Sequence, residues 1–488
     1  MDWDKLVSNE RFEKLASEKV KYFKKYKNSY FENDYQIIIN SPAFRRLQDK
    51  TQVFPLDTSD FVRTRLTHSL ETSYIAKKIG STIIENLKEK VDLSLEKYKN
   101  IEKYFNEIEV IPDILLCTGL LHDMGNPPFG HFGEEIIRNW FRVNLAREDL
   151  KFKGKQIKTL LNEQQIADLL YFEGNAQVLR VILKLYNNDN GYGMNLTKAV
   201  ISSLIKYPVA STDIDGKKIK KNGYFYAEDN IVKEISIKVG TYDGTRILKH
   251  PLAYVLEAAD DIAYATADVE DAFKKGILSF EDIITLLDKY LKEIYVQYHI
   301  SEEEQRYSMS LIKNLEKCRS HKLEEKEVVI NQHLMLMRDW LIYCAAYGFT
   351  RHYTKIMDGI FKGSLLEGTR QFPTIEALKN IAVRHIFIDK NIMTIEISAV
   401  QILCFLLNKF IQAVLQYDFQ KESSKNENGK LIHLLPKSYI ENYKKETKSL
   451  AEEATVYYRI LLVTDFVCGM TDSYAKRLYL DLNGYRDM

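Results

Sequence analysis

The sequence predicts an all-α protein, and three observations lead to this prediction. Only nine prolines occur in 488 residues, so few helices need to break. Apolar residues recur at spacings of three and four, which is the pattern of helices that bury one face. Long segments such as 114–121 and 396–415 contain no proline and therefore admit unbroken helices.

In chain order, the first elements are expected to be helices. Residues 1–30 are charged and aromatic with helical spacing, and residues 82–110 carry Lys and Glu at helical spacing, which predicts a solvated helical insertion. The region 211–248 departs from this pattern, because glycines and an Asp-Gly pair punctuate the β-type runs 235–239 and 245–248. A small β-hairpin insertion is expected there.

The second half of the chain returns to helical spacing. The polar segment 421–430 interrupts it and is expected to be an exposed loop. No internal repeat occurs, and no linker rich in proline, serine or glycine separates two domains. We therefore expect a catalytic core over residues 1–280, with the insertion near 211–248, and a C-terminal helical region over 281–488 that is continuous with the core.

The composition is that of a globular protein of the cell interior. The formal net charge is +1, so the overall balance gives no reason to expect nucleic acid or an anionic membrane as partner. The N-terminus lacks a basic start followed by an apolar signal core, and no apolar run approaches the ~18 residues of a membrane helix. We expect a cytoplasmic protein. Its five cysteines lack paired spacing, which indicates a reducing environment: Cys117, Cys318, Cys344, Cys404 and Cys468.

The stretch 120–135 holds the most informative set of side chains. His122 and Asp123 follow an apolar helix at the point where glycine and proline end it. Imidazole and carboxylate are ligands for divalent ions such as Mn, Fe, Co, Ni, Zn and Mg. A His-Asp pair alone arises by chance about once per thousand residues. His68 upstream and Asp260 downstream complete the order His, His-Asp, Asp, which favours a metal site.

Helical spacing places further polar side chains beside these candidate ligands. Arg65 lies three residues before His68, so both project from one face, and the planar fork of the arginine suits a phosphate oxygen. A surface ion pair is the alternative for Arg65. Asp260, Tyr264 and Asp268 recur every four residues and form one stripe along a helix, which could present a ligand, a phenol and a carboxylate on one wall.

His131 and Glu134 form a second candidate pair. They are three residues apart and follow the break at Gly130. A carboxylate bonded to one imidazole nitrogen fixes the tautomer and raises the basicity of the other nitrogen, so the pair is predicted to act as acid and base. Asn126, beside a proline, is either a polar positioning group or an ordinary turn residue.

Motifs spread from near residue 41 to near residue 475 carry a resemblance to a known family. They are the segments 41–55, 63–68, 122–134, 172–177 and 469–472. In this order they resemble the deoxyguanosinetriphosphate triphosphohydrolase (dGTPase) family of the HD-domain superfamily of metal-dependent phosphohydrolases. The resemblance covers the whole chain and implies an HD-domain helical fold.

The resemblance implies roles for individual residues. It implies that one divalent ion, Mg or Mn, is held by His68, His122, Asp123 and Asp260, and that His131 and Glu134 are catalytic. It leaves Asp261 as a neighbour of uncertain role. The implied substrate-binding set is Gln52, Val53, Arg65, Asn126, Lys206, Tyr264 and Asp268.

Within that set the implied contacts differ. Gln52 and Val53 would pack against the deoxyribose, where a 2′-hydroxyl would be buried without a partner at a cost. Asp268 would also lie at the sugar, Tyr264 at phosphate or sugar, and Lys206 at the phosphates. Solvent exposure is the alternative for Lys206.

The implied reaction is hydrolysis of dGTP to deoxyguanosine and inorganic triphosphate by attack of water at the α-phosphorus. Positioning and charge neutralisation are the major contributions to phosphoryl chemistry in general. No Gly-x-x-x-x-Gly-Lys-Ser/Thr loop occurs, so a P-loop mechanism is excluded at the level of motifs. A homo-oligomeric ring, a hexamer, is also implied by the resemblance.

Two other functions stay open at this point. Within the same chemistry, the enzyme could hydrolyse all four dNTPs and be activated by a nucleotide. From another class, the HD fold could serve a regulatory protein that binds nucleic acid such as single-stranded DNA, with a local groove at the basic cluster 217–221 near Tyr224 and Tyr226. A solvated loop is the alternative for that cluster.

The chain departs from the family pattern in one segment. The family has the form Asp-Arg-Asp-Arg-Ile-Ile before the segment 41–55, whereas this chain has Tyr35 and Gln36 at the arginine positions. The ion pairs of that segment, at a subunit interface for example, are therefore in doubt. The metal and acid–base positions are intact.

Overall fold

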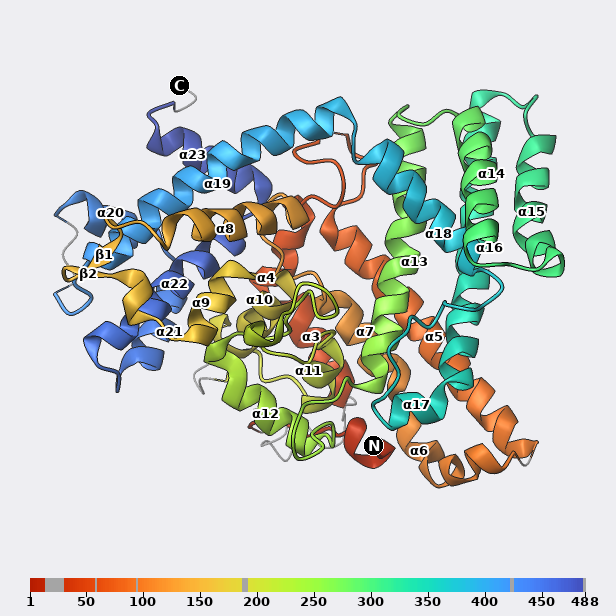
Figure 1. Ribbon diagram of the computed structural model, residues 1–488, viewed down its shortest axis with the longest axis horizontal. Helices are drawn as coiled ribbons and strands as arrows, with labels where there is room; N and C mark the ends of the chain where they lie inside the picture. Colours follow the sequence, from red (N-terminus) through yellow and green to blue (C-terminus); the bar gives the residue numbers. More distant parts are fainter. Residues whose placement is uncertain (14–29, 58, 94, 187–191, 422–424, 486–488) are drawn as a thin grey trace, which may run out of the picture.

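The computed structural model describes residues 1–13, 30–57, 59–93, 95–186, 192–421 and 425–485 (Figure 1). Helices make up most of this part of the chain, and its one sheet has two short strands. The prediction of an all-α protein is therefore confirmed. Of the helical pattern predicted for residues 1–30, residues 14–29 lie outside the described residues.

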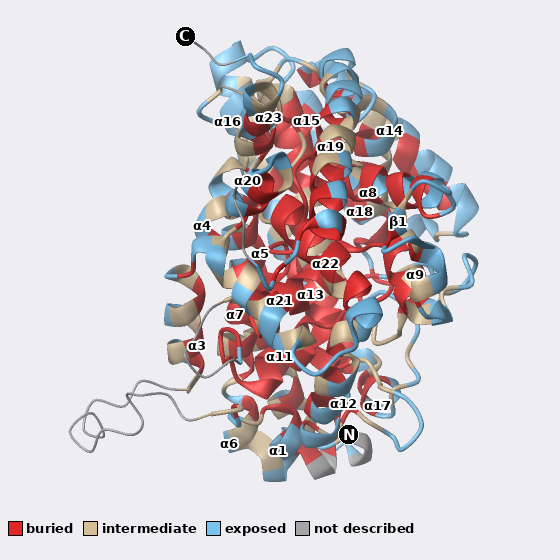
Figure 2. Ribbon diagram, turned by 90° about the vertical axis from the view of Figure 1, so that its left-hand side faces the viewer, coloured by how far each residue is buried: buried red, intermediate tan, exposed pale blue. Residues whose placement is uncertain are grey.

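Helix α13 (Pro251–Lys274) runs through the middle of the molecule (Figure 1). It packs against α5 (Arg65–Asp92), α7 (Ile111–Leu121) and α16 (Leu323–Arg351), and α5 also packs against α7. Most of α13 is buried, and its many alanines allow neighbouring helices to approach closely. Figure 2 shows the buried residues gathered around this centre, with exposed residues on the outer helices. The helix that carries Asp260 is thus held from several sides.

The remaining helices of residues 1–280 surround this centre. The predicted helical insertion over residues 82–110 is helical but not continuous, because α5 ends at Asp92. The other helical elements are α1 (Trp3–Leu6), α3 (Tyr30–Ile39), α4 (Pro42–Arg46), η2 (Leu47–Asp49), η3 (Glu96–Tyr104), α6 (Phe105–Ile108), α8 (Gly130–Asn144), η4 (Ile157–Leu160), α9 (Glu163–Leu170), α10 (Gly174–Arg180), η5 (Val181–Leu185), α11 (Lys198–Leu204), η6 (Ser211–Asp213), η7 (Tyr226–Glu228) and α12 (Asp229–Lys238).

The prediction of a β-hairpin within residues 211–248 is wrong for its first β-type run, residues 235–239. Residues 235–238 belong to α12, because Val232, Ile235 and Val239 are buried at spacings of three and four while Ile237 is 53% exposed. The second run makes only an isolated bridge between Tyr242 and Ile247 across the Asp-Gly turn. The strands of the sheet lie elsewhere, as β1 (Lys151–Phe152) and β2 (Lys155–Gln156).

Residues 281–488 supply helices on both sides of the centre. At one end, α14, α15 and α16 lie side by side (Figure 1). At the other end, α20, α22 and α23 pack against α19, and α21 packs against α22. The predicted loop 421–430 is wrong in its last part, since a helix begins at Glu427 with Asn426 as its cap. These helices are α14 (Phe280–Gln297), α15 (Glu302–Lys317), α17 (Tyr353–Met357), α18 (Phe372–Ile381), η8 (Ala382–Ile386), α19 (Lys390–Gln416), α20 (Glu427–His433), α21 (Lys437–Thr447), η9 (Glu452–Thr455), α22 (Val456–Cys468) and α23 (Asp472–Leu482).

Helix α19 contains the long proline-free segment noted in the sequence. By length and composition it could cross a membrane, and half of its most apolar window is buried inside the structure. The expectation that no apolar run approaches this length is therefore wrong. The helix packs against α22, α20 and α8. Core helices of soluble proteins can have this same length and composition.

Candidate metal and acid–base site

Side chains from three helices converge on one point. His68 projects from α5, His122 follows the end of α7, and Asp260 projects from α13. Asp260 Oδ1 lies 3.2 Å from Nε2 of His68 and 3.4 Å from Nε2 of His122. Asp123 Oδ2 lies 3.5 Å from Nε2 of His122 and 3.9 Å from Nε2 of His68. The structure therefore brings the four predicted ligands together.

The donor set fits a divalent cation. The ligand atoms of His68, His122 and Asp260 lie within 4.8 Å of one another. The Nδ1–H of His122 donates to the carbonyl of Gly119 at 2.7 Å, so the lone pair is on Nε2 and faces the cluster. Among the described residues this buried Nε2 has no hydrogen-bond partner. An imidazole lone pair held in this way beside two carboxylates is suited to a metal ion.

Two buried cations stand behind the carboxylates. Nη1 of Arg65 lies 2.6 Å from Asp123 Oδ2, and Nζ of Lys206 lies 2.6 Å from Asp260 Oδ2. Arg65 is 3% exposed and Lys206 is 8% exposed. The ion pair of Arg65 is therefore buried and not at the surface, and Lys206 is not exposed to solvent.

These charges set the protonation of the cluster. Burial by itself raises the pKa of Asp123 and of Asp260, but Arg65 in the first case and Lys206 in the second hold each pKa below its usual range. Burial lowers the pKa of His122, and the two carboxylates more than offset this and raise it. Both carboxylates are accordingly ionised at neutral pH, as a metal ligand requires.

His131 and Glu134 lie together at the start of α8. Nδ1 of His131 is 3.3 Å from Glu134 Oε2, and the imidazole is largely exposed whereas the carboxylate is buried. Burial raises the pKa of Glu134, but the hydrogen bond to His131 and its charge outweigh this and lower it. A buried, ionised carboxylate thus orients an accessible imidazole, which is the arrangement predicted for acid–base chemistry.

The turn before α8 favours a glycine at position 130. Phe129 and Gly130 have φ angles of 64° and 60°, in the left-handed region. A Cβ atom on Gly130 would lie 2.6 Å from Nη2 of Arg65. Helix α8, which carries the candidate acid–base pair, therefore begins directly against Arg65, beside the candidate metal ligands.

A second glycine lets α10 approach both halves of the site. The N–H of Gly174 donates to Glu134 Oε1 at 2.9 Å, and a Cβ atom at this position would lie 2.3 Å from Asn126 Oδ1. Asn126 Nδ2 in turn donates to Asp123 Oδ1 at 2.5 Å. The structure thus favours the positioning interpretation of Asn126 over that of an ordinary turn residue.

The predicted sugar-binding residues come from two segments, one before α5 and one on α13. Gln52 and Val53 are half-buried, and Thr51 bridges to Thr64 at the start of α5. Tyr264 and Asp268 follow Asp260 along α13. Burial first, and then neighbouring carboxylates, raise the pKa of both side chains. Their contacts with a substrate stay predictions.

Further contacts surround the site. Nζ of Lys221 lies 3.1 Å from Glu173, whose pKa is raised by burial and by Glu134, and Lys221 belongs to the basic cluster 217–221. Asp261, whose role was uncertain, accepts a hydrogen bond from Lys379 of α18 at 2.8 Å. The motif at 172–177 was the available signal for Glu173. The basic cluster 217–221 marked Lys221 but did not indicate this contact, and no local pattern indicated Lys379.

Comparison with known proteins agrees with the geometry. The HD-domain family model matches residues 65–207. A deoxyguanosinetriphosphate triphosphohydrolase-like protein of Listeria monocytogenes is 42% identical over 99% of this chain and 100% of its own length. A like-named protein of Synechocystis is 32% identical over 99% of each chain, and a deoxyguanosinetriphosphate triphosphohydrolase of Enterobacter is 32% identical over 91% of this chain and 92% of its own. The chain is therefore a hydrolase that belongs to the deoxyguanosinetriphosphate triphosphohydrolase family of HD-domain proteins.

Proposed function

We propose that this enzyme hydrolyses dGTP to deoxyguanosine and inorganic triphosphate. One observation carries the proposal: two imidazoles and two carboxylates meet at one point, with Arg65 and Lys206 each 2.6 Å from one of the carboxylates. This arrangement places both negative ligands for a metal and positive groups for phosphate oxygens in one buried region. The names of the relatives support dGTP as the substrate.

The residues of this chain would divide the reaction among them. His68, His122, Asp123 and Asp260 would hold a divalent ion, Mg or Mn, which when bound supplies Lewis-acid polarisation of the α-phosphate. Arg65, Lys206 and Tyr264 would bind and orient the triphosphate, while Gln52, Val53 and Asp268 would bind the sugar.

Proton transfer would fall to the exposed imidazole. His131 is proposed to exchange a proton at Nε2 with the attacking water or the leaving 5′-oxygen, because its Nδ1 is engaged by Glu134 at 3.3 Å. The buried carboxylate would stabilise the imidazolium and keep the ring oriented. Asn126 would hold Asp123 in place through the hydrogen bond described above.

The test is an incubation of the purified protein with Mn or Mg and each dNTP, singly and in pairs, that resolves nucleoside from mono- and diphosphate. Deoxyguanosine with intact triphosphate from dGTP alone is the expected result, abolished in Asp123→Ala. Turnover of all four dNTPs, or turnover only in mixtures, would favour a broad, nucleotide-activated enzyme instead.

Three further predictions of the sequence are untested by the fold. They are the hexameric assembly, the cytoplasmic location, and a role for the cluster 217–221 in binding single-stranded DNA. Lys221 is engaged by Glu173, which leaves Lys217, Lys218 and Lys220 for such a groove. A salt-dependent DNA affinity that is lost when these three lysines are neutralised would support the binding role.

A further inference from the structure

A carboxylate near the end of the chain contacts two segments of the site. Asp472 begins α23 and is 2% exposed. Its Oδ1 accepts a hydrogen bond from the N–H of Phe129 at 3.0 Å. Its Oδ2 accepts one from the N–H of Thr51 at 3.0 Å and another from the Thr51 hydroxyl. Thr51 directly precedes Gln52, and Phe129 directly precedes the helix that carries His131.

A buried lysine joins the same three segments. Nζ of Lys50 donates to the carbonyl of Asn126 at 2.5 Å and to the carbonyl of Cys468 at 2.6 Å. Burial lowers the pKa of this amine to about 8, while Asp472 favours its charged form. A buried acid and a buried base therefore connect residues 50–51 and 126–129 with the last two helices.

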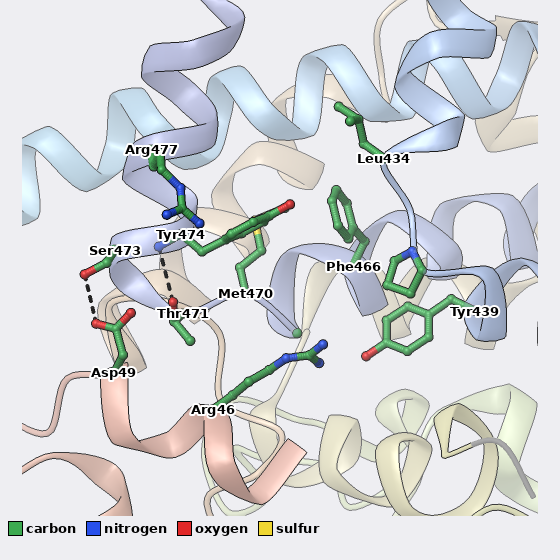
Figure 3. Close-up of a pocket in the computed structure, with 12 residues that line it drawn as sticks. Arg46, Asp49, Leu434, Tyr439, Phe466, Met470, Thr471, Ser473, Tyr474 and Arg477 are labelled. Atoms are coloured by element: carbon green, nitrogen blue, oxygen red, sulfur yellow. Dashed lines mark hydrogen bonds between the residues drawn. The ribbon is translucent and has the colours of Figure 1, made fainter. Parts of the chain in front are cut away.

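The outer side of this junction is a cavity of about 380 Å³, which none of the predicted site residues lines. Ser473 and Thr471, the two neighbours of Asp472, are among the residues that line it (Figure 3). Ser473 donates to Asp49 at 2.9 Å, and Thr471 caps α23 by accepting from the N–H of Tyr474. Asp472 therefore makes its hydrogen bonds on the side of the site, whereas Ser473 makes its hydrogen bond on the side of the surface. A substitution of Ser473 is thus a matched control for one of Asp472.

We propose that Asp472 is a positioning residue, which fixes Thr51 relative to Phe129 and thereby holds the sugar-binding segment in register with the acid–base helix. The proposal rests on the proposed function, because the sugar and the proton concerned belong to that reaction. Phe129 adopts φ 64°, a conformation that an L-residue seldom adopts without support, and its N–H is held by Asp472. Thr51 has no other carboxylate partner among the described residues.

The variant that tests this role is Asp472→Asn. The amide has the size of the carboxylate, and its oxygen can still accept from Phe129, but its NH₂ group would face the N–H of Thr51 and leave that donor unpaired. We expect hydrogen exchange in segments 51–54 and 129–134 to rise together. We also expect kcat for dGTP to fall by about 10- to 100-fold, because a displacement of about 1 Å can cost that much, and the preference for dGTP over GTP to weaken.

Two comparisons separate positioning from mere stability. Ser473→Ala removes the outer hydrogen bond of the same turn and should change neither the exchange of the two segments nor the kinetics. Thr51→Val removes only the hydroxyl bond and should act in the same direction as Asp472→Asn, while Thr51→Ser should restore the wild-type values. This pair keeps the test decisive if Asp472→Asn fails to fold.

The outcomes are distinguishable from failure of the proposed function. A lower Tm with unchanged kcat, KM and dGTP preference per folded molecule would overturn the positioning role, as would faster exchange in only one of the two segments. If the wild-type protein hydrolyses no nucleotide, the proposed function fails. In that case the hydrogen-exchange measurement alone decides whether Asp472 holds segments 51–54 and 129–134 in place together.

Discussion

Arg65 and Asp123 form a buried ion pair in which Nη1 lies 2.6 Å from Oδ2. The same oxygen faces the imidazoles of His122 and His68. A single carboxylate oxygen thus lies between the guanidinium and the candidate metal position. Arg65 therefore lowers the pKa of Asp123, and its own Nε–H is buried without a hydrogen-bond partner among the described residues.

Arg65→Gln tests this relationship. Loss of the cation is expected to raise the pKa of Asp123 and to lower kcat/KM for dGTP on the order of 100-fold, as for other buried donors to developing charge. Steady-state kinetics measures the effect. Arg147→Gln removes an exposed arginine that pairs with Asp149 and should leave the rate unchanged. Equal rates in the two variants would show that Arg65 has no role in the reaction.

His131→Ala and Glu134→Gln address the acid–base pair. Each is expected to lower kcat by about 10²- to 10⁴-fold, the usual contribution of a positioned proton donor or acceptor. The double variant should be little worse than either single variant, because the pair acts as a unit. Arg142→Ala on the same helix is the control, since Arg142 bonds only to the exposed Asn139 among the described residues. Additive losses in the double variant would contradict a shared role.

Metal binding is tested by a neighbouring pair of aspartates. Asp260→Asn should weaken Mn binding by at least about 100-fold, because even the supporting partners of ligands contribute 10- to 100-fold. Asp261→Asn should preserve it, because Asp261 pairs with Lys379. Calorimetric titration with MnCl₂ gives the affinities. At a metal concentration of 100 times Kd the wild-type protein should gain about 2.7 kcal/mol in unfolding free energy, and a chelator should remove this gain. Similar affinities in both variants would place the ion elsewhere.

The stability of the fold is expected to fall in mild acid because of His250. Burial lowers the pKa of this imidazole from 6.5 to about 4, and its Nδ1 accepts from the N–H of Leu252 at the start of α13. As the pH falls, the imidazole of His250 is therefore protonated at a higher pH in the unfolded chain than in the folded protein. The contribution of His250 is present above about pH 6.5 and is lost between pH 6.5 and 4, by up to about 3 kcal/mol.

His250→Asn separates this effect from other titrations. Asparagine can cap the helix in the same way but does not titrate, so the variant should lose stability less steeply over that interval. Urea unfolding at several pH values measures the slope, and His433→Asn, at an exposed histidine, should behave like the wild-type protein. Identical slopes in all three proteins would show that His250 is not responsible.

Much of the site could be predicted because its chemistry is carried by short motifs. His122 and Asp123 are adjacent, His131 and Glu134 share a helical turn, and a stripe of four-residue spacing begins at Asp260. In each case the spacing along the chain alone brings the side chains close to one another, so their proximity can be predicted without knowledge of the tertiary packing. The all-α class followed in the same way from helical periodicity.

The errors have identifiable causes. Residues 235–239 alternate Ile, Ser, Ile, Lys, Val, which fits a strand over five residues, and only burial on α12 shows that the spacing of three and four applies. Lys379 could not be connected with Asp261, nor Asp472 with Thr51, because these contacts join residues that lie 118 and 421 positions apart. No local pattern encodes such a pairing.

The hydrogen bond between Lys50 and Cys468 spans 418 residues of the chain. During synthesis, all four candidate ligands emerge from the ribosome long before residues 468–472. A nascent or prematurely terminated polypeptide would therefore contain every candidate metal ligand and the candidate acid–base pair, and yet lack the groups that contact Thr51 and Phe129. Contacts of such separation also slow folding. A truncation that removes residues 468–472 would accordingly separate the candidate metal ligands from the contacts that hold their neighbouring segments in place.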